Sequence, residues 1–349
     1  MSDSGRRSGF RSWIVMGVVV LIIIGITAVF VYFNQPERYP PPPAGWDTIR
    51  PPYAILALAE QSDVIWAGGA EGVYAIDRST GKISTSVPVE LARITYVRDL
   101  CVDEKGALWI AHDKGLTRLE KDQIHTFTAG DLPAGCCAAV FEDRKGNIWA
   151  GTETGIAMFN GEIWRDFTEE SGFGKIPVTI IFEDSSGVFW FGSDSVNSIG
   201  LMSYNAQDWT SFSVGTGIVA HNTITDILED EDGNLWVASG IGSSGGATCI
   251  KGNTVDAFTM EDGLMGPRVR SLYQDRLGRF WFGSEFEGSA IFDGSKRFFL
   301  TPDQGLAGWE VMEMLEDSAG VLWLATENGI TRIDSADAVT GKLGIYDAK

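Results

Sequence analysis

The chain of 349 residues is poor in the residues that most metal and enzyme sites require. It has three histidines and four cysteines and no C-x-x-C pair, so the sequence does not indicate a zinc site. It contains no P-loop, no G-x-S-x-G elbow and no dinucleotide-binding fingerprint. Most of its 42 glycines instead stand in short hairpin-like phrases, and none opens a helix. From these absences we predict no catalytic residues, no metal and no cofactor.

Basic charge is also scarce. Lysine and arginine number 27 against 47 aspartates and glutamates, which gives a formal net charge of −20. Residues 1–33 hold Asp3 against three arginines, or +2, so the rest of the chain carries −22. So acidic a surface repels nucleic acid, anionic lipid and polyanionic glycans. We therefore expect no nucleic-acid partner, and solubility alone is a sufficient reason for the charge.

One long apolar run stands near the N-terminus. The 20 residues from Ile14 to Phe33 carry no charge, and as a helix they span about 30 Å, the thickness of a bilayer core. Arg6, Arg7 and Arg11 precede the run, which places residues 1–13 in the cytoplasm. A cleavable signal peptide is the alternative, but its apolar region is usually about 7–15 residues and ends at small residues. We predict an uncleaved, single-pass anchor in the cell membrane.

A proline-rich linker follows the predicted span. Residues 34–45 include four consecutive prolines, which favour the extended polyproline II conformation of a semi-rigid spacer. Nothing in this segment distinguishes a recognition motif from a simple tether. The predicted organisation is therefore a cytoplasmic stretch (1–13), a transmembrane anchor (14–33), a linker (34–45) and a folded unit over residues 46–349, held outside the cell in the periplasm or on the cell surface.

The four cysteines leave two interpretations open. They are Cys101, Cys136, Cys137 and Cys249. The predicted compartment permits disulfides, and four cysteines allow three connectivities, among which the sequence does not choose. Because no metal pattern accompanies them, we favour small, buried, apolar side chains.

The chain repeats the phrase Asp-x-x-Gly-x-apolar-Trp. The six complete copies begin at Asp103, Asp143, Asp184, Asp230, Asp275 and Asp317, and a degenerate seventh copy ends at Trp66. Successive tryptophans stand 40 to 46 residues apart. A repeat of this period is typical of propellers, solenoids and arrays.

Each part of the phrase has a physical role in a hairpin. Apolar residues before the Asp indicate a buried strand, and Asp with Gly three residues later suits a tight turn. Apolar-Trp-apolar-small indicates the next strand, in which a small residue lets neighbouring backbone approach closely. Two further short strands follow in each copy. Four strands in about 43 residues describe one propeller blade, so we predict an all-β, seven-bladed β-propeller of four-stranded blades, preceded by one transmembrane helix.

Two segments compete to close the ring. Trp46 to Ile49 resembles the fourth strands at Trp164 and Trp209, so residues 45–50 are predicted to supply the outer strand of the last blade. This pairing would protect an exposed sheet edge. The alternative is the segment from Leu343 to Tyr346.

The phrase D-x-x-G-x-L-W-[IVF]-[GA]-[TS], followed by x-x-G-[IL], resembles the two-component regulator propeller repeat over residues 54–334. This resemblance implies an extracytoplasmic sensor module of the kind found in membrane-bound histidine kinases. In that family two propellers often precede an immunoglobulin-like domain, a membrane span and the kinase domains. This sequence has one propeller, an N-terminal predicted span and no kinase region, so we expect recognition without a kinase output of its own.

Candidate binding residues gather where a propeller has its central channel and its longer loops. Loops lengthen at Ser193–Gly200 and Gly240–Gly246, in adjacent copies and on one predicted face. Together with polar positions on innermost strands and crossovers, they give these candidate ligand-binding residues: Arg98, Asp99, Asp194, Asn197, His221, Asn222, Asp226, Arg270, Trp309 and Glu313. A solvated channel with internal salt bridges is the alternative interpretation.

Three functions fit these observations. The first is a membrane-anchored sensor or recognition module that binds a small molecule, a glycan or a partner protein, such as an envelope protein or a sensor kinase. The second is an enzyme resembling the propeller lyases and lactonases, with a site at the channel mouth, although such sites need converging histidines and carboxylates. The third is a structural adaptor for envelope proteins.

Overall fold

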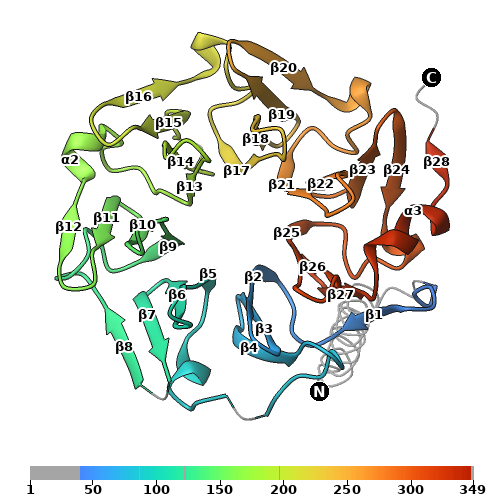
Figure 1. The fold of residues 1–349 in the computed structure, drawn as a ribbon, viewed down its shortest axis with the longest axis horizontal. Helices are drawn as coiled ribbons and strands as arrows, with labels where there is room; N and C mark the ends of the chain where they lie inside the picture. Colours follow the sequence, from blue (N-terminus) through green and yellow to red (C-terminus); the bar gives the residue numbers. More distant parts are fainter. Residues whose placement is uncertain (1–39, 86, 122, 196, 347–349) are drawn as a thin grey trace, which may run out of the picture. The chain divides into compact units, whose positions relative to one another are not determined.

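The computed structural model describes residues 40–346 except 86, 122 and 196. The predicted anchor at 14–33 lies outside the described residues. Within the described part, no helix is long and apolar enough to cross a membrane. Residues from Pro40 onward form one compact unit. Figure 1 shows this unit as seven sheets arranged around a central axis, which confirms the predicted seven-bladed propeller.

The blades are antiparallel sheets, each with its first strand nearest the axis (Figure 1). Blade 1 contains β2 (Ile55–Gln61), β3 (Val64–Gly69) and β4 (Gly72–Asp77), and blade 2 contains β5 (Val97–Val102), β6 (Leu108–His112), β7 (Gly115–Glu120) and β8 (Gln123–Phe127). Blade 3 contains β9 (Cys137–Glu142), β10 (Ile148–Thr152), β11 (Gly155–Phe159) and β12 (Trp164–Asp166), and blade 4 contains β13 (Ile180–Glu183), β14 (Phe189–Gly192), β15 (Leu201–Tyr204) and β16 (Trp209–Phe212). Blade 5 contains β17 (Ile224–Glu229), β18 (Leu235–Ile241), β19 (Ser244–Lys251) and β20 (Thr254–Phe258). Blade 6 contains β21 (Val269–Gln274), β22 (Phe280–Ser284), β23 (Ser289–Asp293), β24 (Lys296–Leu300) and β28 (Ile345–Tyr346). Blade 7 contains β25 (Val311–Glu316), β26 (Leu322–Thr326), β27 (Gly329–Ile333) and β1 (Trp46–Ile49).

Two blades depart from the predicted four strands. Blade 1 has three, and a single bridge between Ile76 and Ile83 stands where its fourth strand would lie. Blade 6 has five, because β28 pairs with the outer strand β24. The remaining blades have four strands each, as the repeat predicts.

The ring closes through its first strand. β1 runs antiparallel to β27, with Trp46 opposite Ile333 and Ile49 opposite Ile330. Trp46 and Ile49 are buried in this position. The prediction for residues 45–50 is therefore confirmed, and the competing C-terminal segment joins blade 6 instead.

The tryptophan of the repeat anchors its own turn. In six blades the indole Nε1–H donates to Oδ2 of the turn aspartate at 2.8 to 2.9 Å, as Trp109 does to Asp103. In blade 1, Trp66 donates instead to the Gln61 side chain at 2.8 Å. A buried indole needs such an acceptor, so the aspartate both closes the hairpin and satisfies the ring.

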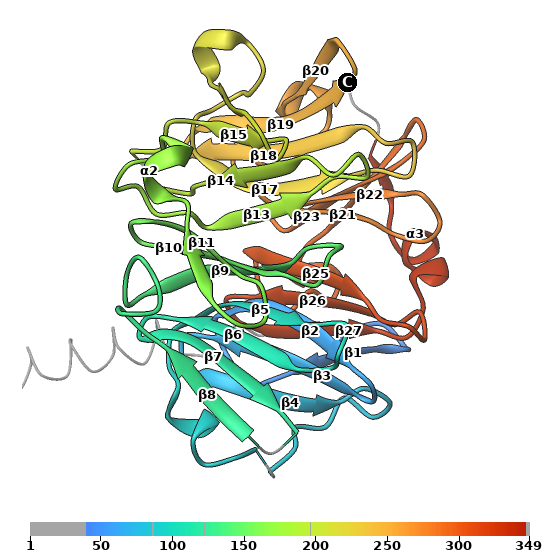
Figure 2. The ribbon, with the colours of Figure 1, turned by 60° about the vertical axis from the view of Figure 1, so that its left-hand side comes forward.

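The same tryptophans fill the space between blades. Trp149 of blade 3 packs on Phe189 of blade 4 with ring centroids 4.6 Å apart, and Trp236 of blade 5 meets Phe280 of blade 6 at the same distance. Trp323 of blade 7 lies in one buried cluster with residues of blade 1. Figure 2 shows the twisted blades stacked one on the next. The core therefore consists of contacts between neighbouring blades.

A side chain next to each turn ties one blade to the one before it. In six seams the residue before the turn accepts a backbone N–H from the preceding blade's turn at 2.6 to 3.0 Å; the acceptors are Glu60, Glu142, Glu183, Glu229, Gln274 and Glu316. The acceptor Glu60 of blade 1 bonds Ser318 of blade 7, so these bonds also span the closure. In the seventh seam, Gln61 donates to the Gly106 carbonyl at 2.8 Å.

Short helical turns lie in the segments between the blades and after the last one. They are η1 (Leu91–Arg93), α2 (Thr168–Ser171), η2 (Val214–Thr216), η3 (Met260–Asp262), η4 (Pro302–Gln304), η5 (Ala336–Ala338) and α3 (Val339–Lys342). From α2 to η4, each turn follows an outer strand and ends at a glycine in the left-handed conformation. These turns reverse the chain and return it to the axis for the next blade.

Candidate functional site

In every blade one residue, within the innermost strand or just ahead of it, points into the channel mouth. In six blades the pairing between first and second strands slips by one residue at the same place, for example between Val97 and Asp99 in β5. In blade 4 the N–H of Thr179 donates to the Gly192 carbonyl at 3.0 Å just ahead of β13. A bulge of this kind re-aims one side chain away from the sheet.

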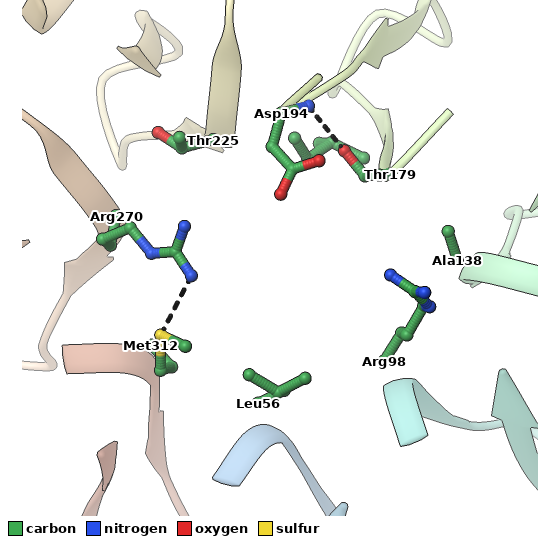
Figure 3. Close-up of a pocket in the computed structure, with 9 residues that line it drawn as sticks. Leu56, Arg98, Ala138, Thr179, Asp194, Thr225, Arg270 and Met312 are labelled. Carbon is green, nitrogen blue, oxygen red and sulfur yellow. Dashed lines mark hydrogen bonds between the residues drawn. The ribbon is translucent and has the colours of Figure 1, made fainter. Parts of the chain in front are cut away.

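These re-aimed side chains form a ring, which we call the mouth ring. Its seven members, one from each blade, are Leu56, Arg98, Ala138, Thr179, Thr225, Arg270 and Met312. With Ile180 and Asp194 they line a cavity of about 150 Å³, and Figure 3 shows them converging from around the axis. In each blade that has the complete sequence phrase, the residue of the mouth ring lies five positions before the turn aspartate.

The two arginines of the mouth ring differ in their partners. Arg270 is fixed, because its Nε lies 3.1 Å from a Glu310 carboxylate oxygen and its Nη2 lies 3.1 Å from the sulfur of Met312. The Arg98 side chain is exposed, and no described residue forms a hydrogen bond or ion pair with its guanidinium. Asp194 is held by its backbone N–H, which donates to Thr179 Oγ1 at 2.9 Å, and its carboxylate faces the cavity (Figure 3). Arg98 is therefore a cation with free donors at the mouth.

Three carboxyl groups lie deeper in the channel, in an adjoining cavity of about 360 Å³. Asp99 accepts the backbone N–H groups of Leu100 and Val140, both at 2.8 Å. Asp226 makes the equivalent pair of bonds to Ile227 and Leu272, both at 2.7 Å. Each aspartate thus joins its own blade to the next one.

Burial changes the titration of these groups. It raises the pKa of Asp99 and of Asp226 to about 7, against the lowering effect of the backbone N–H bonds. The pKa of Glu313 lies well above its ordinary value because of burial first, and then because of the negative charges of Asp226 and Asp99. The channel is water-accessible, yet protein surrounds it on every side, which weakens the solvation of an ionised carboxylate.

The structure brings together six of the ten predicted site residues. Those that line the mouth or the channel are Arg98, Asp99, Asp194, Asp226, Arg270 and Glu313. Asn197 is exposed on the 193–200 loop and does not line the channel cavities. His221 accepts the Thr223 N–H at 3.0 Å, and Asn222 accepts the Val214 N–H at 2.9 Å, so both side chains hold the crossover into blade 5.

One expected loop is a hairpin instead. Residues 240–246 extend β18 and β19, with Gly240 opposite Gly245 and Ile241 opposite Ser244. Glycine permits this because a Cβ at Gly245 would fall 2.4 Å from the Gly240 Cα, and its φ is +144°. The backbone freedom of glycine at this position therefore allows the two strands to pair, and the segment is not a binding loop.

Trp309, the tenth candidate, lies apart from the channel. It lines two further cavities together with Phe286, between blades 6 and 7. Among the described residues, no group of histidine, cysteine and carboxylate side chains is arranged to hold a metal ion.

The architecture and the mouth ring define the class of this protein as a seven-bladed β-propeller with a polar channel mouth. Residues 219–240 and 263–286 match the family described as two component regulator propeller. These two segments carry the repeat of this family, which the sequence phrase resembles. No curated protein sequence matches the chain.

Solved structures of several proteins share the fold. The extracellular domain of BT3049 from B. thetaiotaomicron, assigned as a hybrid two component system, is 16% identical, with a TM-score of 0.69 over 83% of this chain and 42% of that one. Inactive virginiamycin B lyase from Staphylococcus aureus with quinupristin is 15% identical, with a TM-score of 0.65 over 82% and 98%. PorZ, a surface component of the type-IX secretion system of Porphyromonas gingivalis, is 15% identical, with a TM-score of 0.62 over 88% and 50%. The chain spans less than half of the first of these, and such identities show the fold alone.

Proposed function

We propose that this protein is an extracytoplasmic recognition module, anchored by residues 14–33, that binds a small anionic ligand at the mouth ring. The observation that carries the proposal is the exposed Arg98 guanidinium, which has free donors at the mouth of the central channel. A guanidinium offers a planar fork of donors that matches a carboxylate or phosphate. Its ligand chemistry is therefore anionic.

The neighbours of Arg98 support the same ligand. Arg270 adds a second positive charge, held in place by Glu310. The Thr179 hydroxyl accepts the Asp194 N–H and can still donate to a sugar or acid oxygen, whereas the Thr225 hydroxyl already donates to the Val269 carbonyl. Leu56 and Met312 supply apolar contact on the same ring. The channel cavity of about 360 Å³ falls in the range usual for small-molecule sites.

The proposal assigns no catalytic step to the channel. The Asp99 and Asp226 carboxyls have a pKa near 7, where a general base would act, but their oxygens already accept backbone N–H groups of two blades. These bonds favour a structural role over proton transfer. The extracellular two component system domain with the same fold supports recognition outside the cell.

Binding to a panel of small compounds tests the proposal. Phosphate, citrate and glucuronate, with neutral glucose as the reference, are titrated against the full chain by calorimetry and by thermal unfolding. We expect at least one anion to bind and raise the unfolding midpoint. Arg98→Ala should weaken its binding about 10- to 100-fold, because a charged hydrogen bond contributes about 1.5–3 kcal/mol.

A matched control separates the site from general charge. Arg144 is an exposed arginine in the β9–β10 turn, at the opposite end of the strand from the mouth ring. Arg144→Ala removes the same charge and should leave the affinity unchanged. Equal affinity of Arg98→Ala and the parent chain, or the absence of anion binding, would contradict the proposal.

A further inference from the structure

A second surface lies outside the mouth ring, between blades 6 and 7. Phe286, in the β22–β23 connection, is 66% exposed, an unusual state for so large an apolar side chain. It lines two adjoining cavities with Trp309, of about 320 and 360 Å³. Met260, which is 56% exposed, extends the second cavity. The result is an elongated apolar groove rather than a single cup.

Carboxylates line this groove. Glu285, Glu310 and Glu327 face the first cavity and Glu287 the second. We call the surface formed by Glu285, Phe286, Glu287, Trp309, Glu310 and Glu327 the aromatic–acidic groove.

The backbone holds this groove in shape. Glu327 accepts the N–H groups of Trp309 and Glu310, both at 2.9 Å, and so fixes the crossover that carries the tryptophan. A Cβ at Gly308 would fall 2.2 Å from a Glu327 oxygen, so any larger residue there would displace this carboxylate. The Gly288 N–H donates to the Trp309 carbonyl at 2.8 Å, which ties the two walls together. The groove is therefore preformed, which lowers the entropic cost of binding.

The charges of the groove are only partly neutralised. Arg268 pairs with Glu285, and Arg270 pairs with Glu310 at 3.1 Å. Arg50 interacts electrostatically with Glu327, whereas Glu287 forms no ion pair with a described residue. The groove thus presents the uncompensated charge of Glu287 beside the exposed Phe286 ring, a combination that attracts organic cations.

We propose that the aromatic–acidic groove binds a basic segment of a partner polypeptide. A lysine or arginine side chain lies over the Phe286 ring, with its charge directed to the Glu287 carboxylate. The two adjoining cavities suit an extended chain, which places successive side chains in successive pockets. The net charge of −20 steers a basic partner toward the protein and repels acidic ones.

The test uses fluorescein-labelled hexalysine, with labelled hexaglutamate as the charge-reversed probe, and anisotropy titration of the full chain. We expect hexalysine to bind in a salt-dependent manner and hexaglutamate not to bind. Phe286→Ala should weaken hexalysine binding about tenfold, since a cation–π contact contributes of the order of 1 kcal/mol. Phe286→Tyr should retain the affinity, and Glu287→Gln should lower it and flatten its salt dependence.

Two control variants make the result specific. Tyr96 is 59% exposed in the crossover into blade 2, and Tyr96→Ala should not change hexalysine binding. Arg98→Ala should not reduce it either, so this inference and the anion site can fail separately. Hexalysine affinity that is insensitive to Phe286→Ala overturns the proposal. Tetramethylammonium is also tested as a competitor of the labelled peptide. If it displaces the peptide at the same concentration as unlabelled hexalysine does, the groove is a site for small amines, and the proposal of a polypeptide ligand is overturned.

Discussion

The buried ion pair of blade 6 offers a prediction with its own control inside the repeat. Asp275 closes its turn like the other aspartates, but it also holds Arg279, whose Nε and Nη2 both lie 2.7 Å from Oδ2. The Arg279 side chain is 4% exposed and that of Asp275 is 0% exposed. In blade 7 the equivalent aspartate, Asp317, makes the same turn and indole bonds, while Val321 stands in place of the arginine. We therefore compare Asp275→Asn with Asp317→Asn.

The structure gives the expected size of each loss. In Asp317→Asn the oxygen can still accept backbone N–H groups, but the amide NH₂ faces the indole N–H, so one bond is lost at about 1–3 kcal/mol. Asp275→Asn loses the same bond and also leaves the Arg279 charge buried without its partner, which costs about 3–5 kcal/mol. The variant in blade 6 should therefore lose about 3–5 kcal/mol more of the free energy of unfolding.

The assay is urea unfolding of the full chain with a common slope for all variants. Adding Arg279→Val to Asp275→Asn removes the unpaired charge and should recover at least half of the additional loss, because neighbouring substitutions couple. The lost bond from Arg279 to the Ala336 carbonyl limits full recovery. Equal losses for the two single variants, or no recovery in the double variant, would refute the reasoning.

Three further changes test other parts of the structure. Trp46→Ala should lower the free energy of unfolding by about 3–5 kcal/mol, because it removes a buried ring from the strand that closes the propeller. Urea unfolding measures this loss, and a loss under about 1 kcal/mol would count against closure of the ring by this strand. Burial raises the Asp226 pKa to about 7 from 3.8, so between these values the folded protein keeps a proton that the unfolded chain has lost. Stability should therefore fall as pH rises from about 4 to 7, by up to about 1.4 kcal/mol per unit, and Asp226→Asn should reduce this slope; an unchanged slope contradicts the assignment. Burial raises the pKa of the Cys137 thiol, and all four cysteines are free, so the folded protein should react slowly with iodoacetamide at pH 8 and the urea-unfolded chain quickly.

The fold was predictable because its determinants are local. The turn aspartate, the glycine and the tryptophan of each hairpin lie within seven residues, so one phrase predicts both a turn and a buried strand, as from Asp143 to Trp149. The closing strand was predictable for the same reason, since Trp46 opens it as Trp164 opens β12. Sequence similarity between copies was sufficient at both places.

The candidate site was only partly predictable. Arg98 and Arg270 stand out in the sequence by their charge, but Thr179 and Met312 occupy the equivalent position of their blades without any distinguishing chemistry. A bulge displaces one residue without changing the repeat length, so the alignment contains no sign of the displacement. The position five residues before the turn aspartate, compared across all copies, would have revealed the ring. Bonds from Asp99 and Asp226 to the next blade depend on tertiary geometry that no single copy encodes.

The bulge that recurs in the inner strands separates scaffold from selectivity. In six sectors of the disc it turns one side chain toward the channel rather than into the blade, as Arg98 shows. Exchanging these side chains alters charge, shape and hydrogen bonding at the entrance while the tryptophan hairpins stay intact. An engineer can therefore vary these positions as a small combinatorial library without rebuilding the blades, with Arg270 and Met312 exchanged together because they contact each other.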